Sequence, residues 1–146
     1  LNEICKKLSM MILKDGEGSS KVVAFEVKGA KNNQEAEKVS KALSNSLLVK
    51  TALFGNDPNW GRIASTIGAS QVSCDERTLS IFYNNVCVYQ NAQNLFTQEI
   101  EELAFKVLEK EEYKITCDLG ISNGSFTSYG CDLSYEYVKI NAQYRT

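Results

Sequence analysis

The stretch Lys50–Arg62 constrains the fold of this chain more than any other, because it holds the only proline, Pro58, and the only tryptophan, Trp60, of the 146 residues. The mostly apolar residues 47–54 have the composition of a strand. After them, Asp57 can accept hydrogen bonds from free backbone N–H groups, and Pro58 suits the first position of a helix because it has no N–H to lose. The pattern predicts a strand that runs into a helix. Such a helix start can hold an anion; the alternative is an ordinary turn in which Trp60 is a packing anchor.

Apolar residues recur at helical spacing in three further segments, so we expect helices over residues 1–14, 34–47 and 97–110. We expect Met10–Leu13, within the first of these helices, to be buried in the core. The inward face of the third helix should comprise Ile100, Leu103, Ala104, Val107 and Leu108. Alternating or continuous apolar runs predict strands over residues 21–27, 78–83, 86–89, 113–119, 125–130 and 137–142.

Two short loops are expected to join neighbouring strands as hairpins. Asn84–Asn85 separates residues 78–83 from residues 86–89, and asparagine tolerates the positive φ that a two-residue turn requires. Ser122–Gly124 is expected to close a second hairpin. The polar connection Gly29–Asn33 is the best candidate for a domain boundary. Together these elements predict an α+β fold with a mixed sheet and helices packed mainly on one face.

Charge and hydropathy argue against two classes of partner. The formal net charge is −2, the pI is near 5.3 and no basic tract is present, which argues against nucleic acid. No apolar run approaches the roughly 20 residues that a membrane span needs. We expect no signal peptide, because Leu1 opens directly into an amphipathic segment. We therefore expect a chain that associates with neither nucleic acid nor membrane.

The cysteine and histidine content restricts the chemistry. The five cysteines show no metal-binding spacing and histidine is absent, so we expect no metal site. The cysteines are expected to be reduced and to act as small core residues. Without histidine, a Ser-His-Asp or Cys-His catalytic arrangement within this chain is excluded. Any catalysis must rest on carboxylates, hydroxyls, lysine or arginine, or on residues outside the chain.

A second candidate site lies in the glycine-rich turn Asp15–Ser20. Its carboxylate, Glu17, stands between Gly16 and Gly18. Glycines on both sides let the backbone adopt conformations that a bulkier residue resists, and let a ligand approach. The alternative is a plain helix-to-strand turn in which Gly16 ends the helix and Glu17 faces solvent.

Three motifs give the chain a close resemblance to the ornithine acetyltransferases, also called the bifunctional glutamate N-acetyltransferase/ornithine acetyltransferase family of arginine biosynthesis. The motifs are Asp15–Lys21 (DGEGSSK), Lys50–Ile63 (KTALFGNDPNWGRI) and Gly130–Thr146 (GCDLSYEYVKINAQYRT). They occur in family order and span nearly the whole chain. One small departure is Ser19–Ser20, where the family usually has Ala-Thr.

The resemblance implies a mechanism. The family's precursor cuts itself between an alanine and a threonine, and the freed threonine begins the β chain. Its hydroxyl takes the acetyl group from N-acetylornithine and passes it to glutamate. The threonine's own α-amine can act as general base, so no histidine is needed, and groups of the α chain stabilise the oxyanion. This chain starts at Leu1 inside a predicted helix, so the resemblance places the threonine nucleophile upstream of Leu1 and no catalytic residue within the chain.

Family resemblance also implies substrate-binding roles for Glu17, Asn141 and Thr146. A carboxylate suits a substrate amino group, an amide both donates and accepts, and the last residue offers a hydroxyl and the terminal carboxylate. Four residues of the central motif are expected either to line the site or to brace it: Asp57, Asn59, Trp60 and Arg62.

The same resemblance predicts the organisation of the whole protein. Residues 1–30 would be the tail of the larger catalytic α/β sandwich domain, and residues 31–146 a C-terminal α+β domain. The expected partner is the α chain of the same precursor, in an α2β2 or higher assembly in the cytoplasm. No cofactor is expected, with acetyl-CoA as a possible co-substrate. Two alternatives stay open: an amidohydrolase or aminopeptidase that uses water as acceptor, and a binding or assembly domain without catalysis.

Overall fold

A six-stranded mixed sheet forms the centre of the computed structural model, which describes residues 2–143. The strand order is β4-β3-β2-β5-β1-β6, in which β1 and β5 are parallel and the other neighbouring pairs are antiparallel. The strands are β1 (Val22–Ala30), β2 (Ser80–Tyr83), β3 (Val86–Gln90), β4 (Gln93–Asn94), β5 (Glu112–Asp118) and β6 (Gly124–Cys131). The predicted α+β fold with a mixed sheet is therefore confirmed.

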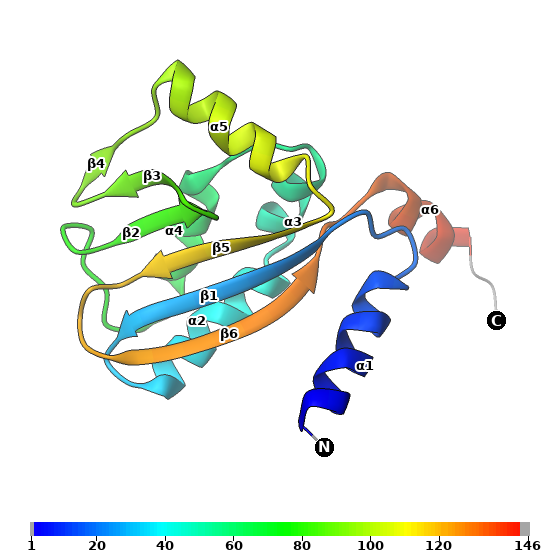
Figure 1. Cartoon of the computed structure of the whole chain (residues 1–146), viewed down its shortest axis with the longest axis horizontal. Coiled ribbons are helices and arrows are strands. Elements are labelled where there is room, and N and C mark those ends of the chain that lie inside the picture. The colour runs from blue at the N-terminus through cyan, green and yellow to red at the C-terminus, as the bar shows by residue number, and fades with distance from the viewer. Residues whose placement is uncertain (1, 144–146) are drawn as a thin grey trace.

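Helices cover one face of this sheet. In Figure 1, α2, α3 and α4 lie behind the sheet, whereas α1 and α6 lie at the end where β1 begins and β6 ends. The helices are α1 (Asn2–Lys14), α2 (Asn33–Asn45), α3 (Leu47–Phe54), α4 (Trp60–Ala69), α5 (Gln98–Leu108) and α6 (Tyr135–Gln143). None of the helices within residues 2–143 is long and apolar enough to cross a membrane.

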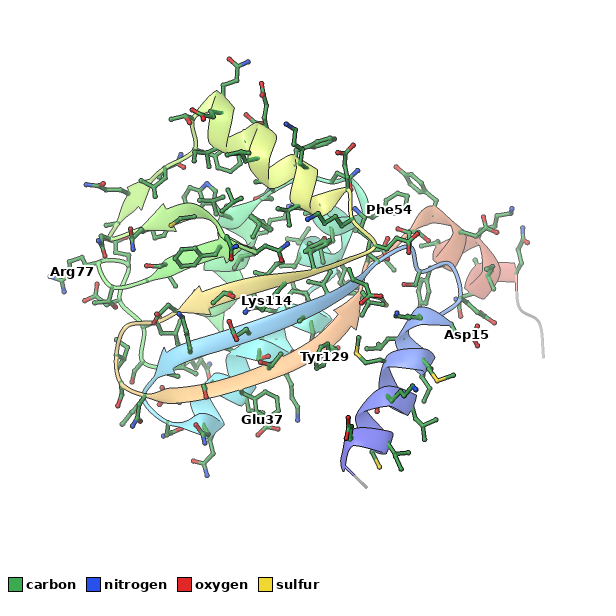
Figure 2. All side chains as sticks on the ribbon, viewed as in Figure 1. Asp15, Glu37, Phe54, Arg77, Lys114 and Tyr129 are labelled. Atoms are coloured by element: carbon green, nitrogen blue, oxygen red, sulfur yellow. The ribbon has the colours of Figure 1, made fainter. Side chains whose placement is uncertain are left out.

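Side chains along β1 point alternately to the two faces of the sheet. Val23, Phe25 and Val27 are fully buried on the helix-covered face and belong to the hydrophobic core. On the other face, Glu26 forms an ion pair with Lys114 of β5, 3.0 Å between Nζ and Oε2. Figure 2 shows Lys114 on the side of the sheet that faces the viewer, opposite α2.

β1 also bears on the organisation of the chain. It is hydrogen-bonded to β5 on one side and to β6 on the other, so residues 22–30 belong to the same sheet as residues 80–131. Asn32 caps α2 directly after β1, with its side chain accepting a hydrogen bond from the backbone of Glu35. The segment 29–33 is thus a short strand-to-helix turn. The division of the protein at residue 30 stays a prediction.

The predicted strand over residues 47–54 is wrong, because this segment is the helix α3. Ser46 caps it by accepting a hydrogen bond from the N–H of Val49, and α3 buries Val49, Ala52 and Leu53, which lie three and four residues apart. The helix expected to begin at Pro58 begins instead at Trp60.

Two further predictions about strands are wrong. Residues 113–119 and 125–130 do form β5 and β6, but not a hairpin, because β1 lies between them. Residues 137–142, predicted as a strand, lie in the helix α6. Its first turn is capped by Ser134, whose hydroxyl accepts a hydrogen bond from the N–H of Tyr137. The hairpin at Asn84–Asn85 is confirmed, with a φ of 50° at Asn84.

Some of the residues expected in the core are exposed. The helix α1 forms as predicted, but Met11 and Ile12 are exposed, the latter by 73%. On α5, Leu103 is exposed although its neighbours Ala104, Val107 and Leu108 are buried. The described residues 2–143 therefore leave the apolar side chains Ile4, Leu8, Met11 and Ile12 of α1 exposed.

Candidate functional site

The glycine-rich turn that carries Glu17 rests on the first turn of α6. Gly18 has a φ of +69°, and a Cβ built there would lie 2.4 Å from the backbone nitrogen of Tyr137. The hydroxyl of Ser134 donates to the carbonyl of Gly18 at 2.5 Å and accepts from the N–H of Tyr137 at 3.1 Å. Glycine is needed at residue 18 both for the positive φ and for the close approach.

Asp132 fastens the end of the same turn. Its side chain is buried, with the residue only 3% exposed. One carboxylate oxygen accepts the backbone N–H groups of Ser20 and Lys21 at 2.9 and 3.0 Å, and the other accepts the Ser20 hydroxyl at 2.5 Å. Hydrogen bonds to an ionised acceptor are about twice as strong as neutral ones. Through Asp132, the motif Gly130–Thr146 therefore holds the end of the motif Asp15–Lys21.

Lys21 connects this turn to the central motif. Although the residue is only 8% exposed, its ammonium group donates to the carbonyl of Leu53 at 2.6 Å, to that of Leu108 at 2.7 Å and to the side chain of Asn56. Burial lowers the pKa of Lys21, and the nearby carboxylates of Asp132 and of a glutamate at the end of α5 oppose that shift. Three acceptors around one buried cation compensate for its lost hydration.

The first half of the central motif also touches the start of α6. The N–H of Leu133 donates to the carbonyl of Lys50 at 3.2 Å. The rings of Phe54 and Tyr135 meet edge to face with their centroids 5.4 Å apart. Figure 2 shows Phe54 at this end of the sheet. Residues 50–56 thus lie against both the glycine-rich turn and the C-terminal motif, so the three motifs meet at one end of the sheet.

The second half of the central motif makes other contacts. Trp60 stacks on Tyr89 of β3, with ring centroids 4.7 Å apart and planes 24° apart. Asn59 caps α4 by accepting the N–H of Arg62 at 3.1 Å and donates to the carboxylate of Asp57 at 2.9 Å. The guanidinium of Arg62 donates to the carbonyl of Leu48 at 2.8 Å. These contacts fix α4 against α3 and β3.

The predicted binding residues are placed as follows. Glu17 is exposed in the turn. Asn141 is exposed on α6, and its side-chain amide donates to the carbonyl of Tyr137 at 2.9 Å. Because Gly18 touches the backbone of Tyr137, the structure brings the Glu17 turn to the helix that carries Asn141. Thr146 lies outside the described residues.

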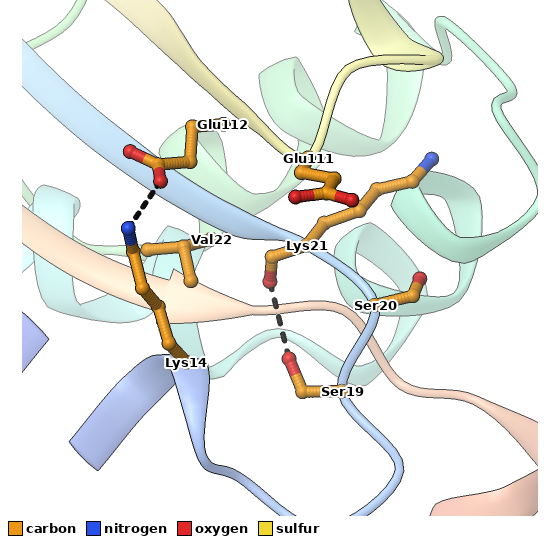
Figure 3. A pocket seen from close by; sticks show the side chains of 7 residues that line it. All are labelled: Lys14, Ser19, Ser20, Lys21, Val22, Glu111 and Glu112. Atoms are coloured by element: carbon orange, nitrogen blue, oxygen red, sulfur yellow. Dashed lines mark hydrogen bonds and ion pairs between the residues drawn. The ribbon is translucent and has the colours of Figure 1, made fainter. Parts of the chain in front are cut away.

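A cavity of about 380 Å³ opens beside the same turn, where β1 begins. Figure 3 shows its lining, which includes the ion pair of Lys14 with Glu112, 2.5 Å apart, and the hydroxyl of Ser19. The cavity is open and mixed in charge. A smaller space of about 300 Å³ lies beside Trp60 and is lined by Asp57, Pro58, Asn59, Trp60, Gly61 and Phe96.

Sequence reasoning did not single out Asp132, Ser134 or Lys21. A signal was present, because an aspartate and a serine just before a helix are typical capping residues. The strand expected at residues 137–142 hid that signal. As for metal chemistry, the part of the chain that the structure describes holds no cluster of acidic and cysteine side chains suited to an ion. Cys5 and Cys74 are exposed, so the expectation that all cysteines act as core residues is wrong.

Comparison with known proteins places these features in a family. The family model described as the ArgJ family matches residues 1–146. An arginine biosynthesis bifunctional protein ArgJ from Wolinella succinogenes is 59% identical over 146 residues, covering all of this chain and 37% of that protein. A glutamate N-acetyltransferase from Methanocaldococcus jannaschii is 44% identical over 149 residues, covering 98% of this chain and 37% of that protein.

The fold agrees with a solved relative. The crystal structure of the arginine biosynthesis bifunctional protein ArgJ from Bacillus halodurans superposes with a TM-score of 0.90 at 40% identity, covering 97% of this chain and 66% of that one. Of the longer curated relatives described above, this chain spans little more than a third of the length. Its sequence over all 146 residues and its fold both identify it: the chain belongs to the ArgJ family.

Proposed function

We propose that residues 1–146 form the C-terminal part of the β chain of an acetyltransferase that moves the acetyl group from N-acetylornithine to glutamate in arginine biosynthesis. The observation that carries the proposal is the family match over the whole chain. The curated relatives are much longer than this chain. We place the threonine nucleophile and the oxyanion-stabilising groups in the part of the protein that these residues do not cover.

In this proposal the chain binds substrate and performs no covalent step. The exposed carboxylate of Glu17 pairs with an amino group of the bound amino acid. The amide of Asn141 hydrogen-bonds a polar group of the same substrate, and Thr146 completes the contact from the end of the chain. Nucleophilic attack, acetyl-threonine formation and transfer to glutamate require neither a metal nor a cofactor.

The exposed apolar stripe of α1 supports a partner within the same precursor. Ile4, Leu8, Met11 and Ile12 lie at helical spacing and are each more than half exposed. Large apolar side chains grouped on one face mark an interaction surface. We propose that this stripe packs against the remaining part of the enzyme, including its α chain, in an α2β2 or higher assembly. The unpaired cysteines suit a cytoplasmic location, because cytosolic thiols stay reduced.

The test is an assay of the full-length protein that contains these residues. Acetyl transfer from N-acetylornithine to glutamate is expected, and Glu17→Ala should raise the KM for N-acetylornithine by about tenfold or more, as expected for the loss of a charge-assisted hydrogen bond. The matched control is Glu76→Ala, an exposed glutamate in another turn, which should leave the KM unchanged. Acetyl release that does not depend on glutamate would instead indicate a hydrolase.

The same assay decides the donor. The relatives carry two names, bifunctional protein ArgJ and glutamate N-acetyltransferase, so we propose acetyl-CoA as a second donor to be tried alone with glutamate. Acetylglutamate formed from acetyl-CoA would make this enzyme bifunctional. Product formed only from N-acetylornithine would restrict it to the transfer between the two amino acids.

A further inference from the structure

We propose that Ser134 and Asp132 are positioning residues, which hold the Glu17 turn against α6 and so fix the separation of the two substrate-binding side chains, Glu17 and Asn141. The inference rests on the proposed function and adds to it a pair of residues that touch no substrate. It follows from how two segments distant in the sequence, residues 16–21 and 132–137, are joined.

Ser134 joins the two segments through one hydroxyl. As donor, this hydroxyl bonds the carbonyl of Gly18, next to Glu17; as acceptor, it bonds the N–H of Tyr137 in the first turn of α6. Ser134 is only 5% exposed, so little water competes for either bond. A single side chain therefore both starts the helix and fastens the turn to it.

Asp132 fixes the other end of the turn. It accepts three hydrogen bonds from Ser20 and Lys21, all between 2.5 and 3.0 Å. Glu17 directly precedes the first attachment point, Gly18, and a backbone hydrogen bond of 3.0 Å from the N–H of Ser19 to the carbonyl of Gly16 closes the turn around it. The backbone that follows Glu17 is thus held at two points, Gly18 and Ser20–Lys21, to the segment that leads into α6.

The helix transmits this placement to Asn141. Tyr137 and Asn141 are four residues apart, so they lie one turn apart on the same side of α6. The amide of Asn141 is further held by its hydrogen bond to the carbonyl of Tyr137. Because the turn contacts the backbone of Tyr137, the Ser134 bond sets how far the carboxylate of residue 17 stands from the amide of residue 141.

Such a separation matters for binding, because an amino-acid substrate presents its charged and polar groups at fixed distances. Binding residues must be held within about 0.5 Å of the productive geometry, and supporting hydrogen bonds provide that precision. A turn released from α6 would keep Glu17 chemically intact but leave it mobile. The expected loss is one of substrate affinity, with the chemical step unchanged.

The experiment compares two cap removals in the full-length enzyme. Ser134→Ala removes the cap of α6 together with the bond to the turn. Thr97→Ala removes an equivalent cap, because the Thr97 hydroxyl accepts the N–H of Ile100 at the start of α5. Ser20→Ala is a milder variant at an exposed residue, which removes one bond to Asp132 and leaves both caps. Each is assayed for KM and kcat with N-acetylornithine and glutamate, and for the melting temperature.

The inference predicts that Ser134→Ala raises both KM values about tenfold and changes kcat by less than about twofold, the signature of lost ground-state binding. Ser20→Ala should raise both KM values by about threefold for the same reason. Thr97→Ala should leave both KM values at the wild-type level while lowering the melting temperature.

Equal KM values in the wild type, Ser134→Ala and Ser20→Ala would overturn the inference and leave the proposed function intact. So would a change of kcat alone. If Ser134→Ala does not fold, the KM values of Ser20→Ala decide. A wild-type enzyme that folds but transfers no acetyl group would refute the proposed function, and the inference with it.

Discussion

Replacing Lys21 by methionine tests whether the buried ammonium group stabilises the junction of the three motifs. Methionine keeps the aliphatic length and loses the donors. The carbonyls of Leu53 and Leu108, in residues that are 1% and 0% exposed, then lose a charged partner. Hydrogen bonds to charged groups contribute about 1.5–3 kcal/mol each, and part of this is offset because the cation no longer has to be desolvated. We expect the free energy of unfolding to fall by about 2–4 kcal/mol.

The assay is urea unfolding followed by the fluorescence of Trp60, the only tryptophan of the chain, whose stacking on Tyr89 makes it sensitive to the core. The matched control is Lys41→Met on the exposed face of α2, where the lysine pairs with Glu37 at 2.6 Å. An exposed pair at this spacing contributes about 0.3–0.5 kcal/mol. If the two variants lose the same stability, the structural role given to Lys21 is refuted.

The pH dependence adds a second criterion. Burial lowers the pKa of Lys21 below its ordinary value of 10.5. Between the lowered pKa and 10.5 the unfolded chain holds the proton more tightly than the folded one, so the stability of the wild type should rise with pH in that window. Lys21→Met lacks this rise, and the difference between the two curves isolates the contribution of the lysine.

Two further predictions concern the sheet. A hydrogen bond from Lys114 holds the pKa of Glu26 below its ordinary value of 4.5. Above pH 4.5 the wild type should therefore exceed Glu26→Gln in stability by about 0.5–1 kcal/mol, and it should lose this advantage as the pH falls through the lowered pKa. Parallel stability curves of the two proteins in acid would contradict this prediction. Burial raises the pKa of the Cys117 thiol to about 12. Iodoacetamide at pH 8 should therefore modify the exposed cysteines quickly and Cys117 only after unfolding, as measured by mass spectrometry. Equal labelling of all thiols in the native protein would refute the burial of Cys117.

The sequence predicted the elements that have a clear period and a local signal. β1 was visible because Val23, Phe25 and Val27 alternate and all three are buried. The β2–β3 hairpin was visible because its turn residues tolerate a positive φ. In both cases the decisive interactions lie within a few residues, so the local sequence contains them.

The segments that sequence reasoning missed lack such a period. Residues 47–54 are mostly apolar, and a short apolar run fits a buried strand and a helix equally well. The signal that favoured the helix was Ser46, which caps it. Residues 137–142 alternate in polarity, but no residue of α6 is buried, so the alternation had no relation to packing.

The candidate site was predictable in its parts and not in its assembly. Glu17 and Asn141 were named from a family resemblance, whereas Asp132 and Ser134 act through bonds to residues more than 100 positions away. Composition and spacing cannot reveal such pairs. The resemblance named four residues between 57 and 62 as candidates to line or brace the site. The contacts of the central motif with the glycine-rich turn and with the start of α6 come instead from residues 50–56.

The position of β1 has a consequence for how the chain is made. Val22 lies opposite Glu112 on one side and Cys131 on the other, and both neighbours are far downstream. During synthesis the first strand leaves the ribosome with both hydrogen-bonding edges open, and it stays so until β5 and β6 emerge. Contacts of such sequence separation fold slowly and expose apolar strands to aggregation. Ribosome-bound chains that end before residue 112 should therefore engage chaperones through Val22–Val27, and release them once the last two strands close around β1.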